Sequence, residues 1–355
     1  MKICLINNLY PPYAVGGTER FVEEQAVELV SQGQQVMIIT ARPYQGWSYI
    51  HPVAGKDGKV TIYRLWQPNI FWYKDLAKHG LLTKLIWHFF DIFNFWLNKE
   101  VKDILKKERP DEVWTHNLTG IGFGIPKIIQ KIGIKQVHYL HDVQLIEPSG
   151  VIAWPGEKLK FSQKFYGFLM KKKFGRPEVV IALSKFLEEF YWFKKFFPGS
   201  RWETKNEKMV LRLPKELPEV TDFLFVGSLV KHKGVELLLQ AWESISGRAN
   251  LHIVGDGELL PLVELWSQEF NNVNIYGRLE REDLARVYEK CQVLLFTSTC
   301  LENRPKVILE ALQNGFYIIA SDTGGVRELL TVNENAWLFK PGDLEELVKR
   351  MKRFT

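Results

Sequence analysis

The chain has 355 residues, which exceeds one average domain and is enough to bury two hydrophobic cores. Its hydrophobic fraction of 46% and charged fraction of 25% are typical of a soluble globular protein and exclude a disordered one. The net charge of +6 is modest and argues against nucleic-acid binding, but residues 1–200 carry 27 Lys and Arg against 18 Asp and Glu (+9), while residues 201–355 carry 20 against 23 (−3).

Short apolar runs alternate with longer segments of helical periodicity, and this alternation occurs twice along the chain. It predicts an α/β protein with two doubly wound, Rossmann-like parallel-sheet domains. The strands expected in the first half are 2–7, 35–40, 60–65, 112–115, 135–140 and 178–183. The helices expected there include 18–32, 79–108 and 184–196.

Three segments bear on location. Residues 81–97 are the most apolar, but charged side chains interrupt them and they are too short to span a bilayer, so no transmembrane helix is expected. The N-terminus does not resemble a secretory signal, and three widely spaced cysteines favour a reducing cytoplasm. Residues 164–176 mix lysines with aromatic side chains, which suits an anionic membrane surface or acceptor; a solvated helix face is an equally good interpretation.

Residues 198–221 are rich in Pro, Lys and Glu and are interpreted as the segment that crosses between domains. We therefore predict a first domain at 1–205, a linker at 206–221 and a second domain at 222–355. The strands expected in the last part are 222–226, 250–254, 272–276, 292–296, 316–320 and 336–339. Ligands of open parallel sheets bind beyond the carboxyl ends of the strands, so substrates are expected between two facing domains.

Two loops of the first half carry candidate residues. Gly16 and Gly17 precede Thr18, a predicted helix cap, and paired glycines allow a phosphate to approach the backbone; a plain turn is equally consistent. His141 follows a strand, where an imidazole can hydrogen-bond or exchange a proton with a hydroxyl, whereas His138 within that strand is expected to be a packed residue. The spaced glycines of a dinucleotide site are missing, so no such cofactor is expected.

In the second half, Gly227 ends the first strand and Lys233 lies before the next helix, where its ammonium group adds to the helix dipole in attracting a diphosphate. Arg278 follows the third strand. A solvated lysine is the commoner alternative. The chain contains no Asp-x-Asp triplet, the usual carboxylate cluster for a metal-bound diphosphate, so we expect metal independence.

Two carboxylates stand eight positions apart in ENRPKVILEA. Pro305 fits the first turn of a helix, which leaves Glu302 in the preceding loop and Glu310 inside the helix. Glu310 suits the vicinal diol of a ribose, and Glu302 suits a sugar ring or its developing positive charge. Single surface carboxylates are common, but the apolar context VILEAL makes a surface role for Glu310 less natural.

Four segments of the chain resemble, in their order and spacing, the retaining GT-B glycosyltransferases of family 4. They are FVGSLVKHKGVELLLQAW, LHIVGDGEL, NVNIYGRLEREDLARVYEKCQVLLFTST and ENRPKVILEALQNGFYIIASDTGGVREL. The resemblance covers nearly the whole chain and is strongest over 222–343. It implies a GT-B fold in which 1–205 is the acceptor-side domain and 222–355 is the nucleotide-sugar-binding domain. It also implies transfer of a sugar from a nucleotide diphosphate sugar with retention, in which the acceptor attacks from the leaving-group face and the departing phosphate takes its proton.

The same resemblance implies roles for single residues. Glu302 and Glu310 match a two-glutamate motif with a seven-residue spacer, in which the first contacts the donor sugar and the second the nucleotide ribose. Lys233 is similar to the lysine that contacts the diphosphate, and His141 to the histidine that hydrogen-bonds the donor near the reacting sugar. The paired glycines near the N-terminus resemble the loop beside the phosphates and acceptor.

The chain departs from the family pattern in donor-binding positions. Ser228 stands where the family usually has an arginine beside the diphosphate, and Arg304 or Lys231 is a candidate replacement. Asn303, Arg304 and Pro305 replace a frequent glycine-rich stretch, which changes the expected backbone contacts to the donor sugar.

The leading interpretation is a cytoplasmic, metal-independent hexosyltransferase that acts on a UDP- or GDP-sugar and a glycan or lipid-linked acceptor. Cell-envelope polysaccharide or glycolipid synthesis, with peripheral contact at the inner membrane face, fits the basic first half. Relatives usually continue into a further helix where this chain stops at Thr355, and the diphosphate arginine is missing. Two alternatives therefore stay open: a non-catalytic nucleotide-sugar or glycan-binding protein of the same fold, and a sugar-nucleotide epimerase.

Overall fold

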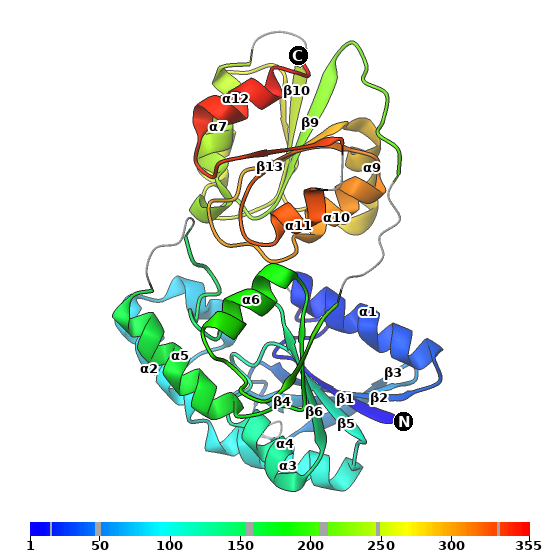
Figure 1. The fold of residues 1–355 in the computed structure, drawn as a ribbon, viewed down its shortest axis with the longest axis vertical. Coiled ribbons are helices and arrows are strands. Elements are labelled where there is room, and N and C mark those ends of the chain that lie inside the picture. The colour runs from blue at the N-terminus through cyan, green and yellow to red at the C-terminus, as the bar shows by residue number, and fades with distance from the viewer. Residues whose placement is uncertain (15, 47–50, 154–158, 206–211, 246–248, 332–333) are drawn as a thin grey trace. The chain divides into compact units, whose positions relative to one another are not determined.

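The computed structural model describes residues 1–14, 16–46, 51–153, 159–205, 212–245, 249–331 and 334–355. The chain forms two compact α/β units (Figure 1). Unit 1 comprises Met1–Gly150, Leu159–Leu183 and Leu187–Lys205, and unit 2 comprises Val151–Lys158, Ser184–Phe186 and Asn206–Thr355. The expected class, two Rossmann-like parallel-sheet domains, is confirmed. Part of the predicted linker, 206–211, lies outside the described residues.

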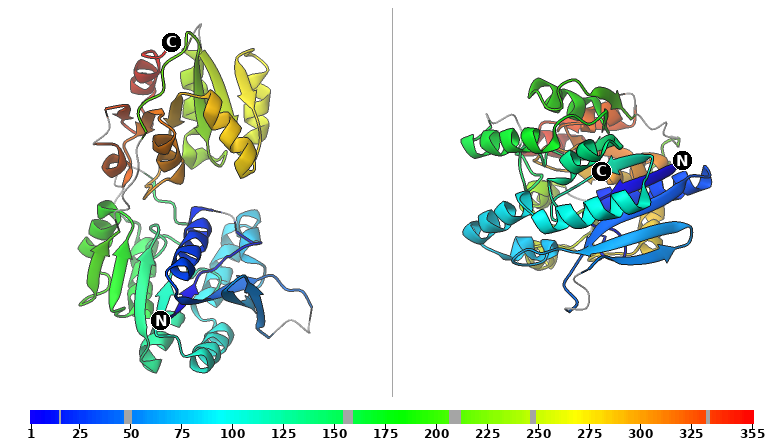
Figure 2. Two further views of the ribbon diagram at one scale, coloured as in Figure 1. Left: turned by 90° about the vertical axis from the view of Figure 1, so that its right-hand side faces the viewer. Right: turned by 90° about the horizontal axis from the view of Figure 1, so that it is seen from below.

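Unit 1 is built on an eight-stranded sheet of order β3-β4-β2-β1-β5-β6-β7-β8. Its neighbouring strands are parallel except β3 and β4. The central strands are almost fully buried because helices cover both faces, as is typical of parallel sheets (Figure 2). The strands are β1 (Lys2–Ile6), β2 (Gln35–Arg42), β3 (Val53–Asp57), β4 (Val60–Trp66), β5 (Glu112–Thr115), β6 (Lys135–Leu140), β7 (Val179–Ala182) and β8 (Arg201–Thr204).

Sequence patterns missed two strands of this sheet. β3 is exposed along most of its length and therefore has no apolar run to reveal it; its partner is β4. β8 lies at the other edge and pairs only with β7. The interpretation of 198–221 as a crossing segment was therefore wrong for the residues of β8. An edge strand pairs on one side only and can form with few apolar residues, so no apolar run in the sequence marks it.

The three helices predicted in unit 1 are present, and two of them differ from the prediction. The helix expected over 79–108 is divided, because the Asn94 side chain accepts a hydrogen bond from Leu97 N (3.1 Å) and caps a new helix. The first helix is capped by Gly16 rather than by Thr18. The helices are α1 (Gly17–Ser31), η2 (Tyr73–Lys78), α2 (Leu81–Ile92), α3 (Phe95–Glu108), α4 (Ile125–Ile132), α5 (Phe161–Phe174) and α6 (Lys185–Phe193).

Unit 2 has a six-stranded, wholly parallel sheet of order β11-β10-β9-β12-β13-β14, and all six strands were predicted within one residue at each end. The strands are β9 (Thr221–Val226), β10 (Ala249–Val254), β11 (Val273–Ile275), β12 (Val293–Phe296), β13 (Tyr317–Ser321) and β14 (Ala336–Phe339). The helices are η3 (Lys231–Lys233), α7 (Val235–Glu243), α8 (Leu260–Ser267), α9 (Arg281–Lys290), α10 (Lys306–Gln313), α11 (Val326–Leu330) and α12 (Leu344–Met351).

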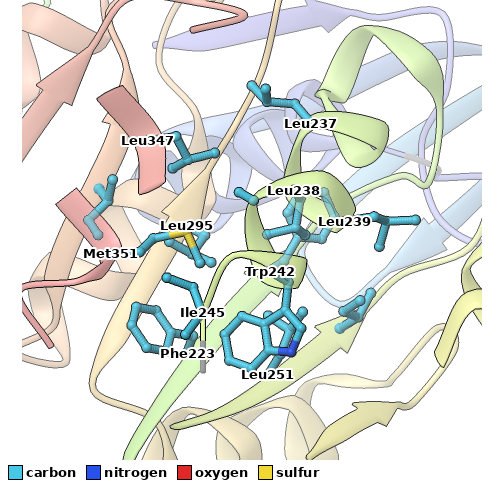
Figure 3. Packing of buried hydrophobic residues seen from close by; sticks show 14 of the residues in the cluster. Phe223, Leu237, Leu238, Leu239, Trp242, Ile245, Leu251, Leu295, Leu347 and Met351 are labelled. Atoms are coloured by element: carbon cyan, nitrogen blue, oxygen red, sulfur yellow. The ribbon is translucent and has the colours of Figure 1, made fainter. Parts of the chain in front are cut away.

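One core of unit 2 lies between its sheet and the helices α7 and α12 (Figure 3). Trp242 of α7 is fully buried and contacts Phe223 of β9 edge-on, with ring centroids 5.7 Å apart. Leu347 and Met351 of α12 are also fully buried there. Burial of such side chains contributes about 1.5–3 kcal/mol each, so this core fixes the sheet whose loops carry the candidate site.

Across the described ranges, the structure contains no helix that is both long and apolar enough to cross a membrane.

Candidate active site

Each sheet reverses its strand order at one point, between β1 and β5 in unit 1 and between β9 and β12 in unit 2. Loops that leave the carboxyl ends of two such strands run to opposite faces of the sheet, and ligands of doubly wound folds bind between them. The predicted site residues come largely from these loops and from the turns beside them.

Lys233 and Glu302 meet at the reversal point of unit 2. Lys233 lies in the loop after β9 and Glu302 in the loop after β12, and Lys233 Nζ is 2.6 Å from Glu302 Oε1. The two side chains are 29% and 14% exposed, so the pair is partly shielded from water. Burial opposes the charge on Lys233, but the attraction and hydrogen bond of Glu302 outweigh it and raise the pKa of the lysine.

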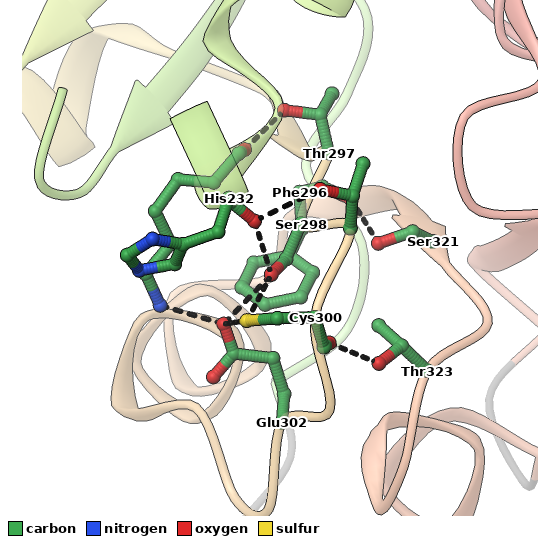
Figure 4. A network of polar contacts seen from close by, with 10 residues as sticks. His232, Phe296, Thr297, Ser298, Cys300, Glu302, Ser321 and Thr323 are labelled. Carbon is green, nitrogen blue, oxygen red and sulfur yellow. Dashed lines mark hydrogen bonds and ion pairs between the residues drawn. The ribbon is translucent and has the colours of Figure 1, made fainter. Parts of the chain in front are cut away.

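A network of polar side chains orients Glu302 (Figure 4). Ser298 Oγ donates to Glu302 Oε1 at 2.8 Å, and Cys300 Sγ lies 3.7 Å from the same oxygen. The hydrogen bonds therefore concentrate on Oε1, the oxygen that also meets Lys233. Sequence patterns did not indicate Ser298; the polar run after the apolar strand β12 is the only signal that marks it.

The backbone packing behind this pair depends on two glycines. Gly234 has φ of +70°, and a Cβ atom there would lie 1.9 Å from Thr297 O. A Cβ atom on Gly324 would lie 2.0 Å from Glu302 O. Thr297 Oγ1 also donates to Lys233 O at 2.9 Å. The loop with Glu302 therefore lies between the turn of Lys233 and the turn of Gly324. A residue larger than glycine would not fit at position 234 or 324.

Glu310 lies inside α10, as predicted, and Tyr288 OH donates to its Oε2 at 3.1 Å. Burial, and then the nearby carboxylate, raise the pKa of Tyr288 well above its usual value, so this phenol remains a donor. Pro305 is the N-cap of α10, not a first-turn residue, because its ψ of 119° is extended. Tyr288 was missed from the sequence because α9 contacts α10 only in the folded unit.

Other predicted donor-binding residues of unit 2 line nearby turns. Gly255 N donates to Gly277 O at 2.8 Å, and a Cβ atom on Gly255 would lie 1.8 Å from Gly227 O, so the turns after β9, β10 and β11 are adjacent. Ser228 and Arg278 are exposed beside these turns.

Asn303 and Arg304 are half-buried in the loop after Glu302. A Cβ atom on Gly325 would lie 2.1 Å from Asn303 O, so the two loops are in close backbone contact. Asn303, Arg304 and Pro305 therefore continue the path of the chain from Glu302 into α10, the helix that carries Glu310.

In unit 1, the paired glycines begin α1. Gly16 is the N-cap, and Glu19 Oε2 accepts from Gly16 N at 2.7 Å. A Cβ atom on Gly16 would lie 3.3 Å from the same carboxylate oxygen, and Gly17 is exposed in the first turn. The Glu19 carboxylate therefore already accepts the hydrogen bond of one backbone amide in this turn, a contact that was not predicted from the sequence.

His141 lies in the loop after β6, and its Nε2 is 2.9 Å from Nδ1 of His116, the residue that follows β5. Phe21 of α1 contacts the His141 ring edge-on, with centroids 5.2 Å apart. Burial, and then the neighbouring His141, lower the pKa of His116 well below its usual value, so it is neutral. One of these two nitrogens therefore donates a hydrogen bond to the other.

His138 is a packed residue. It is 2% exposed, and burial lowers its pKa to about 3. Its Nδ1 lies 3.0 Å from Thr115 Oγ1, inside the sheet.

Within the described residues, no three His, Cys, Asp or Glu side chains gather where they could hold a metal ion.

Comparison with known proteins assigns the chain to a family. Residues 15–202 match the model of glycosyltransferase family 4, and residues 212–355 match that of glycosyl transferases group 1. The chain therefore belongs to glycosyltransferase family 4.

Relatives align along nearly the whole chain. A Klebsiella pneumoniae protein described as an uncharacterized protein in the cps region is 24% identical over 98% of this chain and 91% of its own length. The putative teichuronic acid biosynthesis glycosyltransferase TuaC of Bacillus subtilis is 26% identical over 100% of this chain and 89% of its own length. Among solved structures, sucrose-phosphate synthase from Thermosynechococcus elongatus has a similar fold, with a TM-score of 0.73, 20% identity and coverage of 99% and 89%. The fold is GT-B, and the protein is a glycosyltransferase.

Proposed function

We propose that the chain transfers a hexose from a UDP- or GDP-sugar to a hydroxyl of a glycan or lipid-linked acceptor, with retention of anomeric configuration. The observation that carries this proposal is the Lys233–Glu302 pair at the strand-order reversal of unit 2, with Glu310 on the helix that follows. The relative named for teichuronic acid synthesis and the relative from a cps region support an envelope polysaccharide or its glycolipid precursor as the product.

In the proposed reaction, the diphosphate of the donor takes Lys233 away from Glu302. The ammonium group then stabilises the negative charge that develops as the bond between the anomeric carbon and the phosphate breaks. The acceptor oxygen forms the new bond on the same face, and its proton passes to the departing phosphate. Glu302, released from the lysine, contacts the sugar, and Glu310 accepts hydrogen bonds from the ribose hydroxyls.

Further donor contacts are proposed from the family resemblance. Backbone amides of Gly227 and Ser228, and the side chains of Arg278 and Arg304, lie in exposed or half-buried turns of unit 2. Arg304 or Lys231 is the proposed replacement for the arginine that is missing at position 228.

The proposed leaving-group stabilisation uses no divalent ion. Its support is the absence of an Asp-x-Asp triplet in the sequence and the presence of Lys233 where a diphosphate would bind. Turnover that persists in excess EDTA is the expected result, and activity restored only by added Mn²⁺ or Mg²⁺ would contradict this part of the proposal.

Incubation with radiolabelled UDP- and GDP-sugars, with and without glycan or lipid-linked acceptors, tests the transfer. We expect acceptor-dependent release of UDP or GDP and a labelled product with the anomeric configuration of the donor. Tight donor binding without release would indicate a binding protein, and a new sugar nucleotide without acceptor would indicate an epimerase.

We propose His141 as the residue that hydrogen-bonds the donor sugar near the reacting carbon. Replacing His141 with Ala should lower kcat about 10²-fold or more while changing donor affinity by less than about threefold. The control is His51→Ala, a histidine of unit 1 outside the loops that carry the candidate residues. Equal turnover of the His141 variant and the control would remove His141 from the mechanism.

A further inference from the structure

The helix α2 presents its apolar face outward. Leu82, Leu85, Ile86 and Phe89 follow the i, i+3, i+4, i+7 spacing of one helix face and are 73%, 59%, 44% and 60% exposed. In a globular protein that face normally packs on the core. A contiguous exposed face of large apolar side chains marks a binding surface.

The opposite face of α2 is buried although it carries an ionisable residue. Trp87 and Asp91 are fully buried, and both oxygens of Asp91 accept from Gly120 N at 2.9 Å. Trp87 Nε1 donates to Phe71 O at 2.9 Å. These hydrogen bonds fix the rotation of the helix about its axis, so the outward apolar face is a property of the folded unit.

The neighbouring helix α5 also carries exposed apolar side chains. Phe161, Phe165 and Phe168 are 84%, 56% and 50% exposed at i, i+4, i+7 spacing. Lys173 joins the two helices, because its Nζ donates to Ile92 O at 2.9 Å and lies 4.5 Å from the Phe93 ring centroid. Figure 1 shows α2 and α5 next to one another on unit 1.

Cations accompany the aromatic residues of α5. Lys164 and Lys172 are exposed, and Lys172 Nζ lies 4.4 Å above the centre of the Phe168 ring. In the whole chain, the half that contains both helices has an excess of nine positive charges. Aromatic and leucine side chains with lysines among them match the acyl boundary and the anionic headgroups of a bilayer.

We propose that this α2–α5 surface, formed by Leu82, Leu85, Ile86, Phe89, Phe165 and Phe168, docks the protein on an anionic lipid bilayer. The helices lie in the interface with their apolar side chains among the headgroups, and the lysines contact lipid phosphates. The inference goes beyond the proposed transfer reaction and locates the peripheral membrane contact that the sequence led us to expect. It depends on the surface of unit 1 and not on the transfer reaction.

Co-sedimentation of the full chain with vesicles tests the proposal. The vesicles contain phosphatidylcholine alone or phosphatidylcholine and phosphatidylglycerol in equal parts, at about 0.15 M salt and at high salt. We expect binding to the anionic vesicles that weakens at high salt. The double variant Leu85→Ser/Phe89→Ser and the double variant Lys164→Gln/Lys172→Gln should each lower the partition coefficient about tenfold or more.

Two matched controls lie on unit 2. Leu262→Ser/Leu265→Ser removes two exposed leucines of α8, and Lys290→Gln/Lys352→Gln removes two exposed lysines. Both controls should partition like the unchanged protein. Failure of the unchanged protein to bind anionic vesicles, or equal binding by surface variants and controls, would overturn the proposal.

Two further measurements separate this proposal from its alternatives. Analytical ultracentrifugation of the unchanged protein and of Leu85→Ser/Phe89→Ser tests whether the surface binds a second copy of the chain instead. If the unchanged protein is a dimer that the variant dissociates, and it does not bind vesicles, the membrane proposal is contradicted. Nucleotide release with a soluble acceptor reports the transfer reaction. Release without vesicle binding refutes the docking surface alone, and vesicle binding without release refutes the proposed reaction alone.

Discussion

At the scale of single residues, the candidate site depends on charge balance. Lys233 and Glu302 neutralise one another at 2.6 Å, and Ser298 adds a hydrogen bond to the same carboxylate oxygen. The pair holds a cation and an anion in a partly buried site, and each charge has the other as its partner. A diphosphate can then replace the carboxylate at the lysine, and Glu302 keeps the hydrogen bond from Ser298.

A double-mutant cycle tests this coupling. Lys233→Met leaves Glu302 partly buried without its cation and should lower the free energy of unfolding by about 1–3 kcal/mol. Lys233→Met/Glu302→Gln should be less destabilised than Lys233→Met alone, because the neutral amide needs no cation. Urea unfolding of Lys233→Met, Glu302→Gln and the double variant measures the coupling, with the exposed Lys290→Met as control. Additive effects of the two substitutions would show that the pair is not coupled.

Donor affinity tests the role of Glu310. Glu310→Ala should weaken binding of the correct nucleotide sugar about tenfold or more, because the two ribose hydroxyls lose their acceptor. Tyr288→Phe removes only the hydroxyl that orients Glu310 at 3.1 Å, so a smaller loss of about threefold is expected. Isothermal titration calorimetry measures both, with the exposed Glu289→Ala as control. Unchanged affinity in the Glu310 variant would exclude the proposed ribose contact.

At the scale of secondary-structure elements, the turn at Gly234 between η3 and α7 positions Lys233. Gly234 permits a left-handed turn and direct contact with the loop after β12, which no side chain would allow. The helices that begin at such turns are short, and their packing on the sheet, rather than their own propensity, holds them. The loops are thus positioned by the rigid elements that flank them.

Gly234→Ala tests this close approach. A Cβ atom would meet Thr297 O at 1.9 Å in addition to the cost of a positive φ, so we expect a loss of about 2–4 kcal/mol of stability. Gly342→Ala is the matched control, since its φ is +80° but nothing lies within 4 Å of the added atom. It should lose only about 1 kcal/mol. Equal melting temperatures of the two variants would contradict the packing argument.

At the scale of the whole molecule, one buried acid links stability to pH. Burial raises the pKa of Asp91 from 3.8 to about 8, against the opposing hydrogen bond from Gly120 N. The folded state therefore favours the protonated acid. Its contribution to stability is fully present below a pH of about 4 and is lost as the pH rises through about 8.

Asp91→Asn should remove this dependence, because the amide oxygen still accepts from Gly120 N and carries no charge. Relative to the unchanged protein, the variant should gain roughly 1–4 kcal/mol in free energy of unfolding between pH 5 and pH 8. Urea unfolding at the two pH values measures the difference, and the exposed Asp103→Asn should follow the unchanged protein. A constant difference between the Asp91 variant and the unchanged protein would contradict the raised pKa.

The structure also shows where sequence patterns stop being informative. The segment 81–97 was identified as apolar, yet its pattern does not say which face of α2 is buried; the hydrogen bonds of Asp91 and Trp87 decide that. The edge strand β3 was missed because its exposed residues need no apolar alternation. Both outcomes depend on partners that are distant in the chain.

The sequence by itself determined the two α/β domains, the strands of unit 2, and the residue types of the candidate site. It did so because buried parallel strands are continuous apolar runs and the site residues follow them directly. Only the tertiary structure decided that Lys233 meets Glu302 and that Tyr288 meets Glu310. These contacts require β9 to lie beside β12 and α9 beside α10, and such pairings between distant segments are fixed by packing of the whole sheet, not by local pattern.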